Sequence, residues 1–283
     1  MLKNKLNSSL FFTILTLFSL NILGQTPRQY IGNHMLWTGI ALNGKIKGKF
    51  SYQFDYHYRR QAIANNIASN NTEKYNVFGN AFQQLYRPWI HYNYSPQVRF
   101  SLVPLALWST WTMNSKTKKA DKYLPEFRIS PFIHINSNIG KLVLNHRLGY
   151  EFRFLGKSVS SNEMSDGFTD FTQSANRRGR VRYMIRANYP LFKDKIEDNT
   201  CYISSFNEIF FGTGKNVINT LDQNRTSLSF GYRLKKEVRV EAGYFYQLKF
   251  GTYDSVNKIT KIEEINNFQF FVIFDNLNIF FKK

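Results

Sequence analysis

Arginine and acidic side chains recur at alternate positions along several segments of this sequence. A guanidinium group binds a carboxylate through two parallel hydrogen bonds, and it binds a free anion in the same way. The residues that we predict to share one polar lining are Arg87, Glu126, Arg128, Arg147, Glu151, Arg153, Arg180, Arg182, Arg186, Arg225, Arg233, Arg239, Glu241 and Lys249. Asp55 and Arg59 belong to the same pattern. Either these side chains pair and fill a protein interior, or they surround a water-filled path in which excess arginine favours anions.

The histidines of the chain, His34, His57, His91, His134 and His146, show no catalytic pattern. Nucleophilic catalysis needs a nucleophile, a base and a third polar group that orients the base. No serine forms a recognisable motif with these histidines, and the last of them falls on an apolar face. We therefore predict that the protein is not an enzyme, and a lipid-acting enzyme is the third choice among its functions.

Metal and cofactor sites are also absent from the sequence pattern. Cys201 is the single cysteine, which excludes an intramolecular disulfide and a cysteine-based metal site. Asp222 with Asn224, and Asp166 with Asp170, are expected in loops, where solvated carboxylates are a simpler interpretation than a weak Ca²⁺ site. Because no glycine-rich phosphate loop follows any strand, the sequence predicts no metal and no cofactor.

The elements that position the polar side chains are β-strands, since polar and apolar residues alternate. Between residues 222 and 250, two such runs follow each other across a very short turn. Their mainly apolar faces carry Thr226, Leu228, Phe230, Tyr232 and Leu234, and then Val238, Val240, Ala242, Tyr244, Tyr246, Leu248 and Phe250. A period of two places successive side chains on opposite faces of a strand.

Similar segments can be traced along the rest of the chain. The expected strands are 34–42, 49–60, 84–94, 98–113, 124–136, 142–154, 178–191, 200–212, 225–234, 237–250 and 267–274. A tight turn is expected at Asn43-Gly44, and Glu208 is expected on the polar face. Trp108 and Trp111 are expected in a belt of aromatic side chains at a membrane interface.

Short and long connections alternate between these segments. Short ones lie near residues 95, 138, 194 and 235, and long ones near residues 65, 118, 166, 216 and 257, with 252–262 as the last long loop. Bacterial transmembrane barrels have short periplasmic turns, longer outer loops and an even number of strands. The eleven segments make an odd number, so we expect about 10–12 strands: either residues 276–281 supply a twelfth, which we prefer, or the first segment lies outside the wall and ten remain.

The first 24 residues have the features of a secretory signal peptide. Lys3 and Lys5 precede an apolar stretch that is short for a membrane anchor, the alternative interpretation, and the small Gly24 follows it. Cleavage there leaves 25–283 as a single domain and lowers the formal net charge from +19 to +17. An exported basic chain meets lipopolysaccharide and anionic solutes, so we predict no nucleic-acid partner.

The composition fits a membrane barrel. Aromatic residues make up 17% of the chain, yet its mean hydropathy is only −0.39. In a transmembrane barrel only every second residue faces lipid, and the closed wall satisfies the backbone hydrogen bonds that lipid cannot. The predicted fold is therefore all-β: a transmembrane antiparallel up-and-down β-barrel of the outer membrane.

Several short motifs support this fold. They are Arg87-Pro88 with Tyr92, the strand with Arg180, Arg182 and Arg186, the pair Asn207-Glu208, and the hairpin from Asn224-Arg225 to Gly231-Tyr232. With these motifs the chain, from about residue 37 to residue 274, resembles an uncharacterised family of exported barrels, domain of unknown function 2490. The resemblance implies a barrel in the outer membrane and implies no reaction.

The sequence thus predicts a non-enzymatic outer-membrane protein with a structural or binding role in the Gram-negative cell envelope. A small-solute, anion-preferring channel is the alternative function. The expected partners are outer-membrane lipid and lipopolysaccharide, together with the barrel-assembly machinery during insertion.

Overall fold

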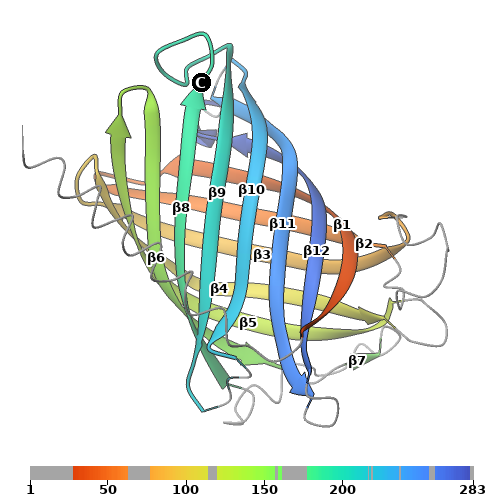
Figure 1. The fold of residues 1–283 in the computed structure, drawn as a ribbon. Helices are drawn as coiled ribbons and strands as arrows, with labels where there is room; N and C mark the ends of the chain where they lie inside the picture. The colour runs from red at the N-terminus through yellow and green to blue at the C-terminus, as the bar shows by residue number, and fades with distance from the viewer. Residues whose placement is uncertain are drawn as a thin grey trace, which may run out of the picture.

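The chain is almost entirely β-structure in the computed structural model (Figure 1). The structure describes residues 28–62, 77–113, 120–156, 159–160, 177–215, 217, 219–235, 237–254 and 259–280, so the expected signal peptide lies outside the described residues. The strands are β1 (Arg28–Lys45), β2 (Phe50–Gln61), β3 (Asn80–Asn93), β4 (Val98–Met113), β5 (Ala120–Ile139), β6 (Leu142–Leu155), β7 (Val159–Ser160), β8 (Arg177–Pro190), β9 (Thr200–Thr213), β10 (Leu221–Arg233), β11 (Val238–Asp254) and β12 (Ile259–Phe274). A short 3₁₀ helix, η3 (Leu277–Phe280), follows β12, and no helix within these ranges is long and apolar enough to span a membrane.

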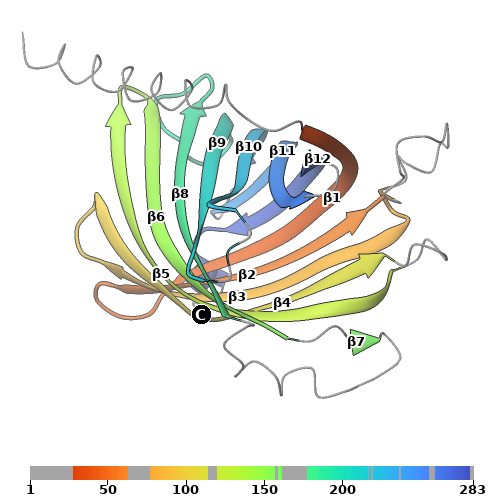
Figure 2. The same cartoon turned by 60° about the horizontal axis from the view of Figure 1, so that its bottom comes forward.

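All of these strands except β7 form the wall of one closed barrel. Neighbours in sequence pair antiparallel, β6 pairs directly with β8, and the two-residue β7 pairs only with one end of β5. The wall closes between β1 and β12, which run parallel, with Arg28 opposite Thr260 and Leu42 opposite Phe274. Figure 1 shows β2 to β5 crossing behind β8 to β12, and Figure 2 shows the wall curving round to close.

Two details of the predicted fold are therefore wrong for the described residues. The wall has eleven strands rather than the preferred twelve, and its closing pair is parallel rather than antiparallel. Residues 277–280 form η3 instead of a twelfth strand. The Asn278 side chain accepts a hydrogen bond from the backbone of Lys45 and donates one back, at 2.9 and 3.1 Å, so η3 holds the end of β1.

The first hairpin turn lies at residues 46–49 and not at Asn43-Gly44 as predicted, because β1 continues to Lys45. Gly48 supplies the left-handed turn conformation, with φ of +56°. A different constraint requires glycine at position 44, because the ring of Tyr52 occupies the space that a Cβ atom of Gly44 would need. At the other end of the chain, the expected loop 252–262 is shorter, since β11 extends to residue 254 and β12 begins at residue 259.

Short turns gather at one end of the barrel. They join β1 to β2, β3 to β4, β5 to β6, β8 to β9 and β10 to β11, and β12 ends at the same side. Lys141 and Asp194 link two of these turns at 2.8 Å, and the hydrogen bond from the lysine lowers the pKa of the Asp194 carboxyl. We call this side the short-turn end and the opposite side the long-loop end. Because β1 ends in one of the short turns, it starts at the long-loop end.

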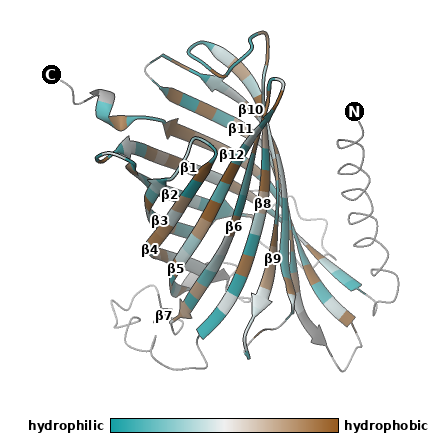
Figure 3. Ribbon diagram, turned by 90° about the vertical axis from the view of Figure 1, so that its left-hand side faces the viewer, coloured by the Kyte–Doolittle hydropathy of each residue, from teal (hydrophilic) through white to brown (hydrophobic). Residues whose placement is uncertain are grey.

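The wall has a polar inside and an apolar outside, the reverse of an ordinary protein core. On β10, Arg225, Ser227 and Ser229 are buried, whereas the alternating Leu228 and Phe230 are 60% and 53% exposed. Figure 3 shows this alternation of hydrophobic and hydrophilic residues along the strands. Other exposed large apolar residues of the wall include Ile40, Phe54, Tyr86, Ile90, Tyr92, Phe100, Leu102, Leu107, Ile129, Leu148, Phe152, Tyr183, Tyr244, Phe268 and Phe270.

Gly149 of β6 lies opposite Phe132 of β5, and the phenylalanine ring covers its Cα. The ring packs on Trp89 with centroids 5.1 Å apart, so it has little room to move. We expect Gly149→Ala to lower the free energy of unfolding by about 1–3 kcal/mol, the usual cost of overpacking. Urea unfolding measures this effect, and Gly32→Ala, where a Cβ meets nothing within 4 Å, is the matched control. Equal unfolding midpoints for both variants would contradict this packing.

Candidate functional site in the barrel lumen

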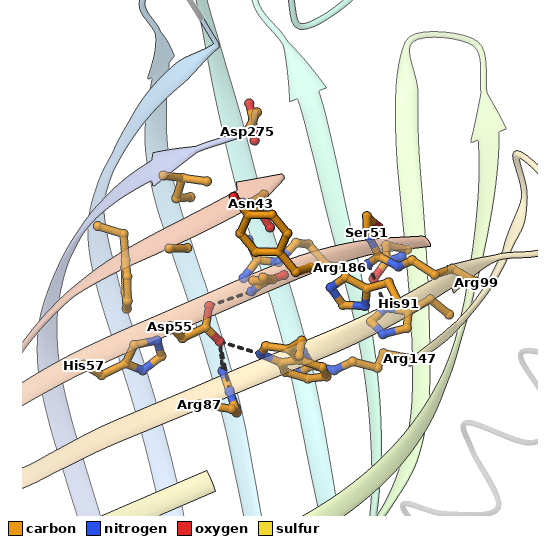
Figure 4. A pocket seen from close by; sticks show the side chains of 18 of the residues that line it. Asn43, Ser51, Asp55, His57, Arg87, His91, Arg99, Arg147, Arg186 and Asp275 are labelled. Carbon is orange, nitrogen blue, oxygen red and sulfur yellow. Dashed lines mark hydrogen bonds and ion pairs between the residues drawn. The ribbon is translucent and has the colours of Figure 1, made fainter. Parts of the chain in front are cut away.

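A cavity of about 770 Å³ lies inside the barrel on the side of the short turns. Lys45, Gly48 and Asp275 line it where the strands end, and Arg59 and Trp108 line its deepest part. Figure 4 shows side chains from several strands pointing into this space, among them Arg87, Arg147 and Arg186. Ten of the lining residues are lysine or arginine and five are aspartate or glutamate, so the cavity is strongly basic.

Toward the long-loop end, ion pairs link inward-facing side chains of β5, β6, β8 and β10. Glu151 is their centre: its carboxylate accepts hydrogen bonds from Arg180 at 2.8 Å and from Arg182 at 2.5 Å, and Arg128 lies 3.5 Å away. Arg180 also binds Asp222 at 2.8 Å. Apart from Asp222, these side chains are almost fully buried. The carboxylates therefore stabilise the buried charge of each guanidinium, because a buried charge without a partner is strongly unfavourable.

Two further carboxylates extend this network, which we call the cross-lumen network. Glu126 accepts hydrogen bonds from Arg128 and Arg153, at 2.7 and 2.6 Å. Glu208 accepts them from Arg147 and Arg182, at 2.9 and 2.7 Å, with Arg225 at 3.7 Å. The register explains these contacts, since Glu151 lies opposite Arg180, and Glu208 opposite Arg225, on neighbouring strands.

A second group of pairs lies closer to the short-turn end. Asp55 accepts hydrogen bonds from Arg87 at 2.7 and 2.9 Å and from the indole of Trp89 at 2.8 Å, as Figure 4 shows in part. Glu241 accepts one from the hydroxyl of Tyr202 at 2.7 Å. The remaining contacts are Arg186 and Arg239 with Glu241, both at 3.6 Å, and Arg239 with Asp275 at 2.6 Å.

The predicted polar lining is thus brought largely into one region. Twelve of its fourteen members, all but Arg233 and Lys249, belong to the two groups of contacts described above. Arg233 lies at the short-turn end, 3.5 Å from Asp198 and 3.9 Å from Glu237. Lys249 forms a partly exposed pair with Glu263 at 2.6 Å.

Tryptophan rings inside the lumen, stacked on arginines, were not predicted. Arg59 stacks on Trp37 at 3.7 Å and Arg128 on Trp108 at 3.9 Å from the ring centroid, which are favourable cation–π contacts. Trp108 is buried, so its predicted place in an outer aromatic belt is wrong. A bulge between Val103 and Ala106 reverses the facing of β4, and this bulge contains the proline of that strand.

Three histidines, His57, His91 and His134, also line the cavity. The Nδ1 atom of His91 lies 2.7 Å from the hydroxyl of Ser101, its cross-strand partner, a contact that the sequence motifs did not reveal. Within the described ranges no carboxylate forms a hydrogen bond to this histidine. The pair therefore lacks the acid that orients the base in a catalytic triad. His146 lies on the outer face, against Tyr183.

No cluster of three potential metal ligands occurs among the described residues. Asp222 and Asn224 lie in β10 rather than in a loop, and the first is bound to Arg180. Asn224 points to the outer side, where it accepts a hydrogen bond from Asn207 at 3.3 Å. The other acidic pair, Asp166 and Asp170, lies outside the described residues.

Comparison with known proteins gives a family but no activity. A family model described as a protein of unknown function, DUF2490, matches residues 34–257. This stretch contains the whole cross-lumen network and most of the wall. A search of curated proteins found no match.

Proposed function

Starting from the fact that the chain belongs to the DUF2490 family of proteins of unknown function, we propose that it is a non-enzymatic outer-membrane barrel with a binding role in the cell envelope. The observation that carries this proposal is the polarity of the wall. Many charged and polar side chains are buried inside, and large apolar side chains such as Leu228, Phe230 and Phe268 stand exposed on the outside. Such a surface is unfavourable in water and is favourable against acyl chains.

The geometry of the wall adds independent support. Closure between β1 and β12 leaves no unpaired strand edge in the wall, which matters because lipid offers no hydrogen-bond partner to the backbone. The wall strands contain 12 to 20 residues, and a tilted strand needs roughly 9–11 residues to cross the hydrocarbon layer. Lipid and lipopolysaccharide would surround this wall, and the barrel-assembly machinery would insert it.

Electrophoretic mobility of the full chain tests this proposal. Protein extracted from the outer-membrane fraction with mild detergent is expected to migrate differently in SDS gels before and after boiling, because a closed barrel resists SDS. Recovery of the folded protein in the soluble fraction, without detergent and with one mobility, would contradict the proposal.

The orientation of the barrel in the membrane gives a second expectation, because its two ends differ. With the short turns in the periplasm, the start of β1 lies at the outer surface and η3 lies on the periplasmic side. A protease-sensitive epitope inserted in the turn at residue 192 is therefore expected to resist protease in intact cells and to be cleaved after the outer membrane is permeabilised. Cleavage of this epitope in intact cells would reverse the orientation.

An anion-preferring channel is the second candidate, and the basic cavity favours it. The cross-lumen network opposes it, since Arg180, Glu151 and Glu126 occupy the lumen beyond the cavity. We expect no discrete current steps in planar-bilayer recordings of the native protein. Steps whose anion preference changes in Arg182→Glu would establish the channel instead.

The geometry of the Ser101–His91 pair supports the absence of catalysis. The pair lies inside the lumen, away from the outer face where acyl chains would lie, and both side chains are buried. We expect no turnover of labelled phospholipid or lipid A by the folded protein. Turnover that disappears in His91→Ala would overturn this expectation.

A further inference from the structure

The deepest part of the cavity contains a buried arginine without an acidic partner. Arg59 is 5% exposed and lines the cavity, yet no carboxylate of the described residues lies within ion-pair distance of it. The neighbouring charges that act on it most strongly include four more guanidiniums, those of Arg225, Arg128, Arg87 and Arg182. The native protein thus holds a positive charge where its own residues do not neutralise it.

The stacking of Arg59 on an aromatic ring determines which of its atoms can bind a ligand. Its guanidinium lies 3.7 Å from the ring centroid of Trp37, so one face of the group is covered by the indole. The five N–H donors of a guanidinium lie in its plane and point away from its faces. A stacked arginine therefore keeps its hydrogen-bonding edge for a planar acceptor such as a carboxylate, or for a phosphate.

Neighbouring groups have the same surplus of donors. The indole N–H of Trp37, the indole N–H of Trp108 and the Nε–H of Arg225 are buried and have no acceptor among the described residues. Arg225 lies 3.7 Å from Glu208 and donates a hydrogen bond to Gln223 at 3.1 Å. Its guanidinium also lies near Phe245, which packs against Trp37. Unsatisfied buried donors are rare in folded proteins, so the three around Arg59 show that this part of the barrel is short of acceptors.

We propose that the lumen cavity binds a small organic anion that enters from the short-turn end and places a carboxylate or phosphate group against Arg59 and Arg225. This inference rests on the proposed function for the direction of entry, from the periplasm. The volume of about 770 Å³ is in the range of small-molecule sites. Glu126, Glu151 and Arg180 do not line the cavity and are buried in the barrel beyond it, so in this proposal the anion binds and leaves by the same opening.

Fluorescence titration of the detergent-folded full chain tests this proposal, because Trp37, Trp89 and Trp108 are buried in the lumen. The probes are citrate, which carries carboxylates, inorganic pyrophosphate, which carries phosphates, and glucose as a neutral solute, all in about 0.15 M NaCl. We expect a saturable change with citrate, pyrophosphate or both, which identifies the preferred oxyanion, and none with glucose. Saturation by neither anion, in protein that still shows heat-modifiable mobility, would overturn the anion site and leave the barrel proposal intact.

Variants of neighbouring arginines complete the test. Arg59→Gln removes the unpaired charge and is expected to weaken anion binding at least about tenfold. Arg225→Gln is expected to weaken it by a similar factor. Arg60→Gln is the matched control, since Arg60 is the next residue on β2, faces outward and hydrogen-bonds Tyr58. If one of these two lumen variants fails to fold, the affinity of the other still tests the proposal. Equal affinity in the native protein and in a folded lumen variant would refute the proposal.

Discussion

Replacement of Glu151 by glutamine is expected to destabilise the barrel more than any other single change considered above. The carboxylate of Glu151 contacts Arg180, Arg182 and Arg128, and all four side chains are almost fully buried. Glutamine keeps the shape but removes the negative charge, so three guanidiniums lose a shared partner in a site without bulk water. Loss of one member of a buried ion pair costs about 3–5 kcal/mol.

Urea titration of the folded protein in detergent measures this loss as a lower unfolding midpoint. The matched control is Glu263→Gln, which removes the same charge from a pair with Lys249 that is about one-third exposed. An exposed pair contributes about 0–1 kcal/mol, so the control is expected to lie close to the native protein. If both variants shift the midpoint equally, the cross-lumen network does not stabilise the barrel.

Leu228→Arg is expected to give the second largest loss. Leu228 lies near the middle of β10, between Ser205 of β9 and Tyr244 of β11, and its side chain is 60% exposed on the outer face. An arginine that faces the centre of a bilayer costs about 2–4 kcal/mol, whereas a similar substitution on a water-exposed surface changes stability by about 0.5 kcal/mol at most.

Phospholipid vesicles are therefore the medium for this comparison, with unfolding followed by tryptophan fluorescence. The control is Phe192→Arg, because Phe192 is 96% exposed but lies in the β8–β9 turn, at the end of the barrel. We expect the control to unfold like the native protein. Equal stability of Leu228→Arg and the control would mean that the outer face of β10 is not in contact with lipid.

Much of this fold follows from the alternation of side chains. The period of two places Leu228 and Phe230 on one face of β10 and Arg225 on the other, and the structure has the same arrangement. The hairpin turns at residues 94–97 and 140–141 also fall near the predicted short connections. Strand facing is a local property, so it can be deduced from the sequence of each strand alone.

Features that depend on neighbouring strands could not be predicted in this way. The bulge at residues 103–106 of β4 turns Trp108 inward, and a simple count of residues misses it. The parallel closure of β1 on β12 depends on contacts between the two ends of the chain. Which arginine meets Glu151 depends on the register of β6 against β8, and the sequence does not contain that register in any single segment.

The site was only partly predictable for the same reason. Its arginines and glutamates were visible as a polar pattern, and His57, His91 and His134 share the polar faces of their strands. Trp37 and Trp108 were not assigned to the site. Asp222 was expected in a loop, although it lies on β10 and binds Arg180. Arg59 belonged to the pattern, while its lack of a carboxylate partner emerges only from the three-dimensional arrangement.

Solvent accessibility along β10 tests most directly whether the apolar outer face touches acyl chains. Single nitroxide labels at residues 226 to 231, in a Cys201→Ser background that removes the one native cysteine, are compared in vesicles for collision with oxygen and with a water-soluble nickel chelate. We predict that labels at 226, 228 and 230 collide with oxygen and are protected from the chelate. Free access of the chelate to residues 228 and 230 would show that this face is in water, and the membrane assignment would then be wrong.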